Sequence, residues 1–128
     1  MRILITGEKG FVGSETAKLL GMHGHEVLGF DLMQGYDIRD INQLYDKVTF
    51  FSQAKHKPDA ILHLAAIARF SDADRNPRLA FETNVEGTRN VVDIAKQHHI
   101  PLVYASTGSV YMPIQGVPEQ GIDENLPA

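Results

Sequence analysis

The first thirteen residues constrain the fold more than any other stretch of the chain. Residues 3–5 form a short apolar run, which is typical of a central parallel strand covered on both faces. Three glycines follow. Gly7 allows a tight turn, Gly10 lets a ligand approach the backbone, and Gly13 lets the next helix lie close to the strand. The stretch predicts a strand, a glycine-rich turn and a helix whose amino end favours an anion.

The residues after the turn strengthen this prediction. A helical pattern follows Gly13, and a second apolar run over residues 27–30 ends at Asp31, 24 residues after Gly7. A carboxylate at that place can accept hydrogen bonds from the hydroxyls of an adenosine ribose. A turn without a ligand is the alternative, since glycines also fill ordinary turns. The combination favours a site for a dinucleotide whose pyrophosphate lies at the start of the helix.

Length and composition exclude several classes of protein. The 128 residues predict one domain, 1–128, and 43% of them are apolar, as in soluble globular proteins. No apolar run approaches the roughly 20 residues of a membrane span, and no signal peptide is expected at the start. A net charge of -4 argues against nucleic acid as a partner. The absence of cysteine excludes disulfides and fits a cytoplasmic protein.

Strands and helices are expected to alternate along the chain. The expected strands cover residues 3–5, 26–30, 35–40, 60–64 and 102–105. Such alternation implies an α/β fold, a Rossmann-like doubly wound parallel sheet of about five strands with helices on both faces. Ligands bind such sheets beyond the carboxyl ends of the strands, where Gly7, Asp31, Ala65 and Ser106 are all expected.

The longest helix is expected to begin at Pro77, after a loop-like polar segment over residues 66–76. Apolar residues recur in it at spacings of four and three, with charged residues on the opposite side. The predicted core face consists of Phe81, Val85, Thr88, Val92 and Ala95. A second apolar set, which widens this face and is free to meet another subunit or another part of the chain, consists of Ala80, Gly87, Val91 and Ile94.

Short motifs occur at the ends of the predicted strands. They are Thr6-Gly7-x-x-Gly10-Phe11-Val12-Gly13, Asp31, Asp37-Ile38-Arg39-Asp40, His63-Leu64-Ala65-Ala66, Asn84-Val85-x-Gly87-Thr88 and Ser106-Thr107-x-x-Val110-Tyr111. In this order they resemble the NAD-dependent epimerase/dehydratase family of extended short-chain dehydrogenases/reductases, which includes UDP-glucose 4-epimerase. The resemblance covers essentially the whole chain. It implies the NAD-binding Rossmann domain, the N-terminal part, of such an enzyme.

The resemblance also implies which residues contact the cofactor. The pyrophosphate would be held by Gly7, Gly10, Gly13 and the backbone amides of Phe11 and Val12. Asp31 would hold the adenosine ribose, while Asp37 and Ile38 would flank the adenine. The groove under the second ribose and the nicotinamide would be lined by Leu64, Ala65 and Ala66.

The last motifs lie near the reacting end of the cofactor in that family. Asn84 would organise the sheet and the cofactor, and Ser106 would border the nicotinamide. Thr107 occupies the position of the catalytic Ser or Thr, whose hydroxyl donates to the oxygen at the carbon where hydride is removed or added.

The expected cofactor is NAD rather than NADP. Asp31 would repel a 2′-phosphate, because a carboxylate beside a dianion is costly, and the next residues, Leu32 and Met33, are not basic. Lys9 favours NADP instead, since related NADP enzymes often carry a basic residue there.

One catalytic pair of the family, a Tyr with a Lys four residues later, is absent from the sequence. The residues four positions after Tyr36, Tyr45, Tyr104 and Tyr111 are Asp40, Thr49, Gly108 and Gln115. Residues 123–127 resemble the segment just ahead of that tyrosine, so the chain is expected to lack the catalytic Tyr/Lys segment, the last strands and the substrate lobe. It is expected to bind cofactor without turning over a nucleotide sugar. An exposed sheet edge predicts a homo-oligomer.

Three functions remain open at this point. The first is the cofactor-binding portion of a sugar-nucleotide epimerase or dehydratase, which transfers hydride between a sugar carbon and NAD. The second is a naturally short, non-catalytic dinucleotide-binding module. The third is an atypical NADP-dependent reductase or redox sensor, favoured by Lys9 alone.

The histidines are not expected to bind a metal. His98 and His99 are adjacent, so their side chains diverge, and no third ligand accompanies them. His63 ends a buried strand and is expected to be a hydrogen-bonded core residue.

Overall fold

The computed structural model describes residues 1–53 and 57–107. Within this part, four strands form one sheet: β1 (Arg2–Thr6), β2 (Glu26–Phe30), β3 (Ala60–His63) and β4 (Leu102–Tyr104). All pairs are parallel, in the order β2-β1-β3-β4, so β1 lies between β2 and β3. The predicted motif residues Val110 and Tyr111 and the segment 123–127 lie outside the described residues.

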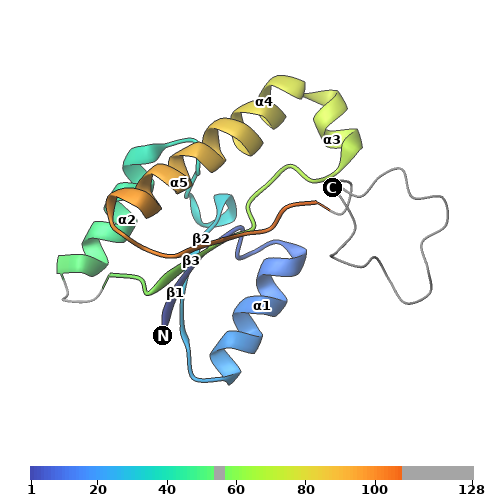
Figure 1. Cartoon of the computed structure of the whole chain (residues 1–128). Coiled ribbons are helices and arrows are strands. Elements are labelled where there is room, and N and C mark those ends of the chain that lie inside the picture. Colours follow the sequence, from blue (N-terminus) through green and yellow to red (C-terminus); the bar gives the residue numbers. More distant parts are fainter. Residues whose placement is uncertain (54–56, 108–128) are drawn as a thin grey trace, which may run out of the picture.

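Helices cover both faces of the sheet, as Figure 1 shows. One face carries α1 (Phe11–Met22), and the other carries α2 (Ile41–Gln53) and α5 (Thr88–Gln97). Two short helices, α3 (Phe70–Arg75) and α4 (Pro77–Phe81), precede α5 in the same layer. This confirms the predicted α/β fold, a Rossmann-like doubly wound parallel sheet.

The main core lies between the sheet and the α2–α5 layer. Leu4 of β1 pairs with Leu28 of β2 and Ile61 of β3, and all three are buried. Such residues are buried because parallel strands are covered by helices on both faces. The largest cluster of buried residues comprises Leu4, Leu28, Phe30, Ile38, Leu44, Val48, Ile61, Val91, Ile94, Ala95 and Ile100.

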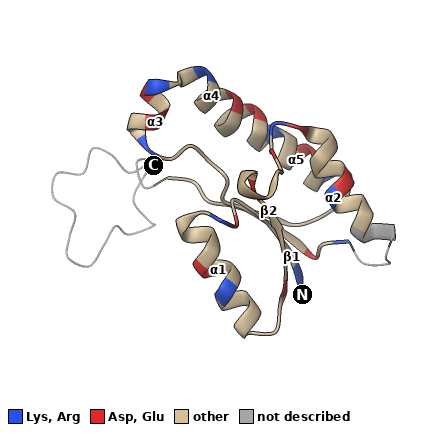
Figure 2. Ribbon diagram, turned by 180° about the vertical axis from the view of Figure 1, so that it is seen from behind, with Lys and Arg blue, Asp and Glu red and all other residues tan. Residues whose placement is uncertain are grey.

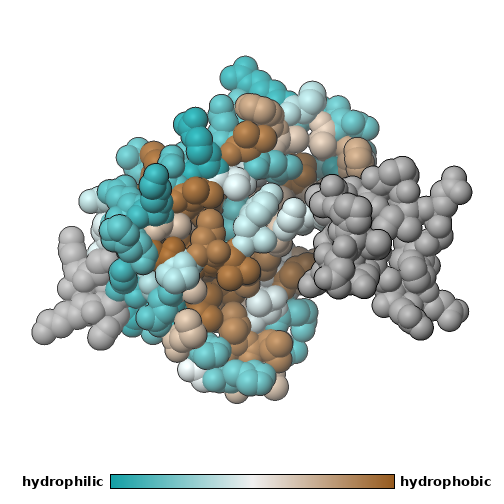
Figure 3. All heavy atoms as spheres, viewed as in Figure 1, coloured by the Kyte–Doolittle hydropathy of each residue, from teal (hydrophilic) through white to brown (hydrophobic). Residues whose placement is uncertain are grey.

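The surface of the described residues is mixed in character. Acidic and basic residues are intermixed along α3, α4 and α5 (Figure 2). Hydrophobic side chains gather in the middle of the face that Figure 3 shows. Among the described strands β4 is an edge strand, and its Val103 and Tyr104 are exposed. No helix in the described part is both long enough and apolar enough to cross a membrane.

The predicted third strand over residues 35–40 is wrong. After Asp31 the chain forms a short 3-10 helix, η1 (Leu32–Gln34), and Gly35 then takes a left-handed conformation with φ of 84°. Residues 36–40 are irregular, and Ile38 alone is buried among them. The backbone groups of this segment are bonded by side chains and by turns instead of by a neighbouring strand. Gln43 accepts from Asp37 N and Asn90 donates to Ile38 O, while Tyr36 N and Asp40 N donate to backbone carbonyls a few residues earlier.

The segment 66–76 is not wholly a loop, because residues 70–75 form α3. The helix predicted from Pro77 is also interrupted. Asn76 caps α4 by accepting from Leu79 N, and the chain then passes through a π-helical segment, η2 (Glu82–Gly87), before α5. A π turn contains an extra residue and often occurs at functional sites.

The core face predicted for this helix is only partly right, because Ala95 is buried and Thr88 half-buried but the other three residues are exposed. Phe81, Val85 and Val92 are 57%, 52% and 42% exposed. The buried side is the second apolar set of the prediction, namely Ala80, Gly87, Val91 and Ile94, together with Ala95. The reason is the close approach of the helix to the segment after β2: a Cβ on Gly87 would lie 2.8 Å from Ile38 Cδ1. The face that carries Gly87 is therefore the one that packs against the segment after β2.

The glycine turn forms as predicted, and two of its glycines are sterically required. Gly7 has a φ of 75°, and a Cβ there would lie 2.7 Å from Ala65 N. A Cβ on Gly13 would lie 2.0 Å from the carbonyl oxygen of Gly7. Since Cβ atoms essentially never come within 3.0 Å of another heavy atom, only glycine allows α1 to lie this close to β1.

His63 is a hydrogen-bonded core residue, as the sequence predicted. It is 1% exposed, and its Nδ1 lies 2.5 Å from Thr6 Oγ1, while its Nε2 lies 2.9 Å from Thr88 Oγ1. Thr6 Oγ1 already accepts from Leu64 N and Ala65 N, so its hydrogen is left to donate to Nδ1. The imidazole is therefore neutral with its proton on Nε2. Burial lowers the pKa of His63 from 6.5 to about 4.

Replacing Gly13 with Ala should destabilise the chain, because the new methyl group has no room between α1 and the glycine turn. We expect the free energy of unfolding to fall by about 3 kcal/mol, as for severe overpacking. The control is Gly21→Ala in the same helix, where a Cβ meets nothing within 4 Å. That change should stabilise the chain by up to about 1 kcal/mol, by helix propensity. Urea unfolding measures both; equal stability of the two variants would contradict the packing described.

The buried histidine should make the fold sensitive to mild acid. The folded pKa of about 4 lies below the unfolded value, so the unfolded chain takes up a proton first as the pH falls. Above about pH 6.5, His63 should therefore not change the free energy of unfolding with pH. Between about pH 6.5 and pH 4, protonation of His63 in the unfolded chain should lower the free energy of unfolding by about 3 kcal/mol. In His63→Asn that part of the pH slope, measured by urea unfolding, should vanish. The control variant His23→Asn, at an exposed position, should keep the wild-type slope. An unchanged slope in His63→Asn would refute the assignment of this pH dependence to His63.

Candidate functional site

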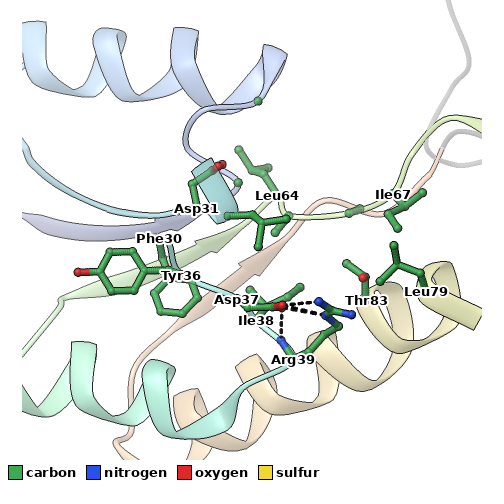
Figure 4. Close-up of a pocket in the computed structure, with 15 residues that line it drawn as sticks. Phe30, Asp31, Tyr36, Asp37, Ile38, Arg39, Leu64, Ile67, Leu79 and Thr83 are labelled. Carbon is green, nitrogen blue, oxygen red and sulfur yellow. Dashed lines mark hydrogen bonds and ion pairs between the residues drawn. The ribbon is translucent and has the colours of Figure 1, made fainter. Parts of the chain in front are cut away.

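Two adjoining hollows lie at the carboxyl end of the sheet. The first has a volume of about 290 Å³ and the second about 350 Å³. Both are lined by the segment that leaves β3, residues 64–67, and together they are called the crevice. Of the predicted site residues, the first hollow is lined by Gly7, Gly10, Asp31, Asp37, Ile38, Leu64, Ala65 and Ala66 (Figure 4). The second is lined by Leu64, Ala65, Ala66, Asn84, Ser106 and Thr107.

The helix α1 begins at the edge of the first hollow. Its N-cap is Gly10, and no side chain caps it; Ser14 N makes the bond to Gly10 O. The amides at the start of a helix have no partner within the helix and carry a partial positive charge. Phe11 and Val12 thus offer backbone amides, while the Phe11 side chain is 93% exposed. Neither they nor the buried Gly13 line the two hollows.

Asp31 connects the end of β2 to the glycine turn. Its Oδ2 accepts a hydrogen bond from Lys9 N at 2.9 Å, and its Oδ1 accepts from Met33 N at 2.8 Å. Each carboxylate oxygen can accept two hydrogen bonds and accepts one here, so each retains one acceptor site for a ligand hydroxyl. The Lys9 ammonium pairs with Glu8 at 2.8 Å. The carboxylate is therefore fixed beside the turn, where the sequence predicted it.

The far end of the first hollow is aromatic and aliphatic. The ring of Tyr36 stacks on Phe30 with centroids 5.0 Å apart, and Lys47 Nζ lies 4.0 Å from the Tyr36 centroid. The sequence prediction did not include several residues that line this hollow: Phe30, Leu32, Tyr36, Arg39, Ile67, Leu79 and Thr83. Only Arg39 belongs to one of the motifs. Leu79 and Thr83 come from the interrupted helix, whose inner face was predicted only in part.

A charged pair lies at this end of the hollow. The Arg39 guanidinium donates to both carboxylate oxygens of Asp37, with Nε at 3.0 Å from each (Figure 4). This hydrogen bond, opposed by burial, holds the pKa of Asp37 below its ordinary value. The same bond raises the pKa of Arg39. Asp37 is therefore an ionised group that only accepts hydrogen bonds.

Two asparagines attach the long helix to the loops of the crevice. Asn84 Oδ1 accepts from Ile67 N at 2.8 Å, and its Nδ2 donates to Ile67 O at 3.0 Å. Asn90 Nδ2 donates to the carbonyl oxygens of Ile38 and Arg39 at 3.0 Å each. Half-buried amide side chains that are bonded to loop backbone in this way hold the loops in one conformation. Asn84 therefore holds the wall that the two hollows share.

The second hollow collects the predicted residues that follow β4. Ser106 and Thr107 are exposed and lie with Tyr104 and His63 around it. The Tyr104 ring stacks on His63 with centroids 5.5 Å apart. Nowhere in residues 1–53 and 57–107 do three His, Asp or Glu side chains gather closely enough to hold a metal ion. The polar side chains here are hydroxyls and the amide of Asn84, beside a neutral imidazole.

Comparison with curated proteins shows relatives of greater length. UDP-glucose 4-epimerase from Halalkalibacterium halodurans is 32% identical over 142 aligned positions, which cover 99% of this chain and 41% of the relative. Protein CapI from Staphylococcus aureus is 32% identical over 87% of this chain and 39% of the relative. The chain therefore spans about two fifths of the length of these relatives.

Solved structures share the fold. UDP-glucose 4-epimerase from Thermus thermophilus, crystallised in complex with NAD, matches 99% of this chain and 44% of its own, with a TM-score of 0.76 and 30% identity. The model of the NAD dependent epimerase/dehydratase family matches residues 3–128. Because that match extends over nearly all of a chain with the same backbone arrangement, this chain belongs to the NAD dependent epimerase/dehydratase family.

Proposed function

We propose that this chain is the cofactor-binding domain of a nucleotide-sugar epimerase or dehydratase, and that it binds NAD across the carboxyl end of its sheet. The observation that carries the proposal is the bond between Asp31 Oδ2 and Lys9 N. It brings a ribose-binding carboxylate to the glycine turn at which α1 begins. Amide groups that can donate to a phosphate thus lie beside a carboxylate that can accept from ribose hydroxyls.

The two hollows suit the two halves of a dinucleotide. The pyrophosphate would lie on Gly7 and Gly10 and on the amides of Phe11 and Val12. From there the adenosine half would run past Asp31 into the aromatic end of the first hollow, toward Asp37 and Ile38. The nicotinamide half would follow residues 64–66 into the second hollow. The small side chains of Ala65 and Ala66 would let the nicotinamide ring lie against the backbone.

The same geometry supports NAD over NADP. Asp31 carries a negative charge where the ribose hydroxyls would bind, and a 2′-phosphate there would meet it. The nearest basic side chain in the turn, Lys9, already pairs with Glu8. NADP is the second candidate because dTDP-4-dehydrorhamnose reductase from Bacillus anthracis, solved in complex with NADP, is 29% identical with a TM-score of 0.76, over 89% of this chain and 39% of its own.

In the complete enzyme, bound NAD would supply reversible hydride transfer at a carbon of the sugar. Thr107 borders the second hollow and would donate its hydroxyl hydrogen to the sugar oxygen. The 128 residues contain no Tyr followed four residues later by Lys, so they lack the expected general base. The domain assignment 1–128 and a homo-oligomeric state are part of the same proposal.

The chain should bind NAD more tightly than NADP in calorimetric titration. Replacing Asp31 with Asn should weaken NAD binding about tenfold or more, because hydrogen bonds from the ribose to a charged acceptor are lost. Asn at position 31 also removes the negative charge, so the ratio of the dissociation constant for NADP to that for NAD should fall. Asp93→Asn on the exposed side of α5 is the matched control and should leave both affinities unchanged. Tighter binding of NADP by the unaltered chain would overturn the proposed cofactor.

The purified chain should not turn over UDP-glucose or UDP-galactose, since a proton relay without its base does not run at a useful rate. Coupled assays with NAD present measure this. Steady turnover that is lost in Thr107→Ala would show that the 128 residues carry a complete catalytic set, contrary to the proposal.

A further inference from the structure

Arg39 holds the Asp37 carboxylate in one orientation. Besides the contacts of Nε, Arg39 Nη2 donates to Oδ2 at 2.5 Å, and the backbone Arg39 N donates to Oδ1 at 2.9 Å. A carboxylate bound by a guanidinium fork and a backbone amide cannot rotate without breaking several charged hydrogen bonds. The direction in which Asp37 can still accept is therefore fixed.

One acceptor site of the Asp37 carboxylate is left unused by the hydrogen atoms that Arg39 directs at it. A carboxylate has about four lone-pair sites. The hydrogens that point to Asp37 are those of Arg39 N, Nε and Nη2, with the Nε hydrogen shared between the two oxygens. One site is thus left for a donor from the hollow that Asp37 lines.

Arg39 is itself held by the interrupted helix. Its Nη1 lies 3.5 Å from Glu82 Oε2, and Glu82 also accepts from Arg78 Nε at 2.7 Å. The carbonyl oxygens of Ile38 and Arg39 are fixed by Asn90. The loop that carries Asp37 is therefore attached to η2 and α5 by both its backbone and its side chains.

The position of Asp37 along the hollow determines which group of the dinucleotide it would contact. With the phosphates at the glycine turn and the ribose at Asp31, the base lies farther along, beside Tyr36, Asp37 and Ile38. The exocyclic amine of adenine donates hydrogen bonds, whereas hypoxanthine carries a carbonyl oxygen at the same position. An ionised carboxylate attracts the amine and repels the carbonyl.

We propose that Arg39, held by Glu82, is a positioning residue that aims Asp37 at the base and so sets the preference of the site for 6-amino over 6-oxo purines. This inference rests on the proposed binding of NAD. Arg39 acts through Asp37, so its removal should change base preference and leave the contacts of the phosphates and the riboses in place.

The test compares NAD with nicotinamide hypoxanthine dinucleotide, whose base has a carbonyl oxygen in place of the amine at that position and carries a hydrogen on the neighbouring ring nitrogen N1. Calorimetric titration of the unaltered chain should give a dissociation constant for NAD about tenfold lower or more, as expected for a hydrogen bond to a charged acceptor. In Arg39→Gln this ratio should fall to about two or less, mainly through weaker NAD binding. The ratio is measured in one preparation, so a loss of active protein does not change it.

Two further variants show whether Arg39 works through Asp37. Asp37→Asn should also bring the ratio to about one, because an amide can offer either a donor or an acceptor. Adding Arg39→Gln to Asp37→Asn should then change the ratio no further. Arg75→Gln is the control, because Arg75 pairs only loosely with Asp72 at 3.9 Å and does not line the hollow. It should keep the full ratio.

Glu82→Gln keeps the proposal testable if Arg39→Gln does not fold, because it removes the charge that holds Arg39 and leaves the Arg39–Asp37 pair. The ratio should drop to an intermediate value, while Glu86→Gln on the same π-helical segment should not change it. A wild-type ratio in Arg39→Gln, or in Glu82→Gln where that is the variant that folds, overturns the inference. So does an unaltered chain that binds the two dinucleotides equally. Failure of the unaltered chain to bind NAD overturns the proposed function itself.

Discussion

The crevice depends on two places where backbone meets backbone with no room for a side chain. Gly7 lies against the backbone of Ala65, and Gly13 lies against the carbonyl of Gly7. The first contact brings the turn after β1 against the segment after β3, and the second presses the start of α1 onto that turn. Because of these contacts, an uncapped helix start and two strand ends converge at one hollow.

Polar side chains then fix the loops around that hollow. His63 joins Thr6 of β1 to Thr88 of α5, Asn84 holds Ile67, and Asn90 holds the loop at Ile38. All three attach the same layer, η2 and α5, to strand ends or to the loops after them. A site built in this way is arranged before its ligand arrives, so less free energy is lost in ordering it. This arrangement also explains why a helix far from the glycine turn in sequence contributes Leu79 and Thr83 to the hollow.

Much of this could be predicted from the sequence, because the strands of a parallel sheet and the turns that follow them have local signatures. The run 3–5, the glycines and Asp31 define β1, the turn and the end of β2 without tertiary information. The strand predicted over 35–40 does not form, because its backbone groups are bonded within turns and by the side chains of Gln43 and Asn90, which lie outside the segment. The inner face of the long helix was predicted only in part, because the helix turns Gly87 toward Ile38 and leaves Phe81 and Val85 exposed. Arg39 belongs to a sequence motif but has no predicted role, since its pairing with Asp37 and Glu82 is visible only in three dimensions.

The central claim is that adenine dinucleotide lies across the carboxyl end of the sheet with its adenosine ribose at Asp31. A crystal structure of the chain soaked with NAD tests this most directly. The account predicts the pyrophosphate over Gly10 and the start of α1, and the ribose hydroxyls within hydrogen-bond distance of the Asp31 carboxylate. Density for the dinucleotide elsewhere on the molecule, or a ribose that does not contact Asp31, would contradict it.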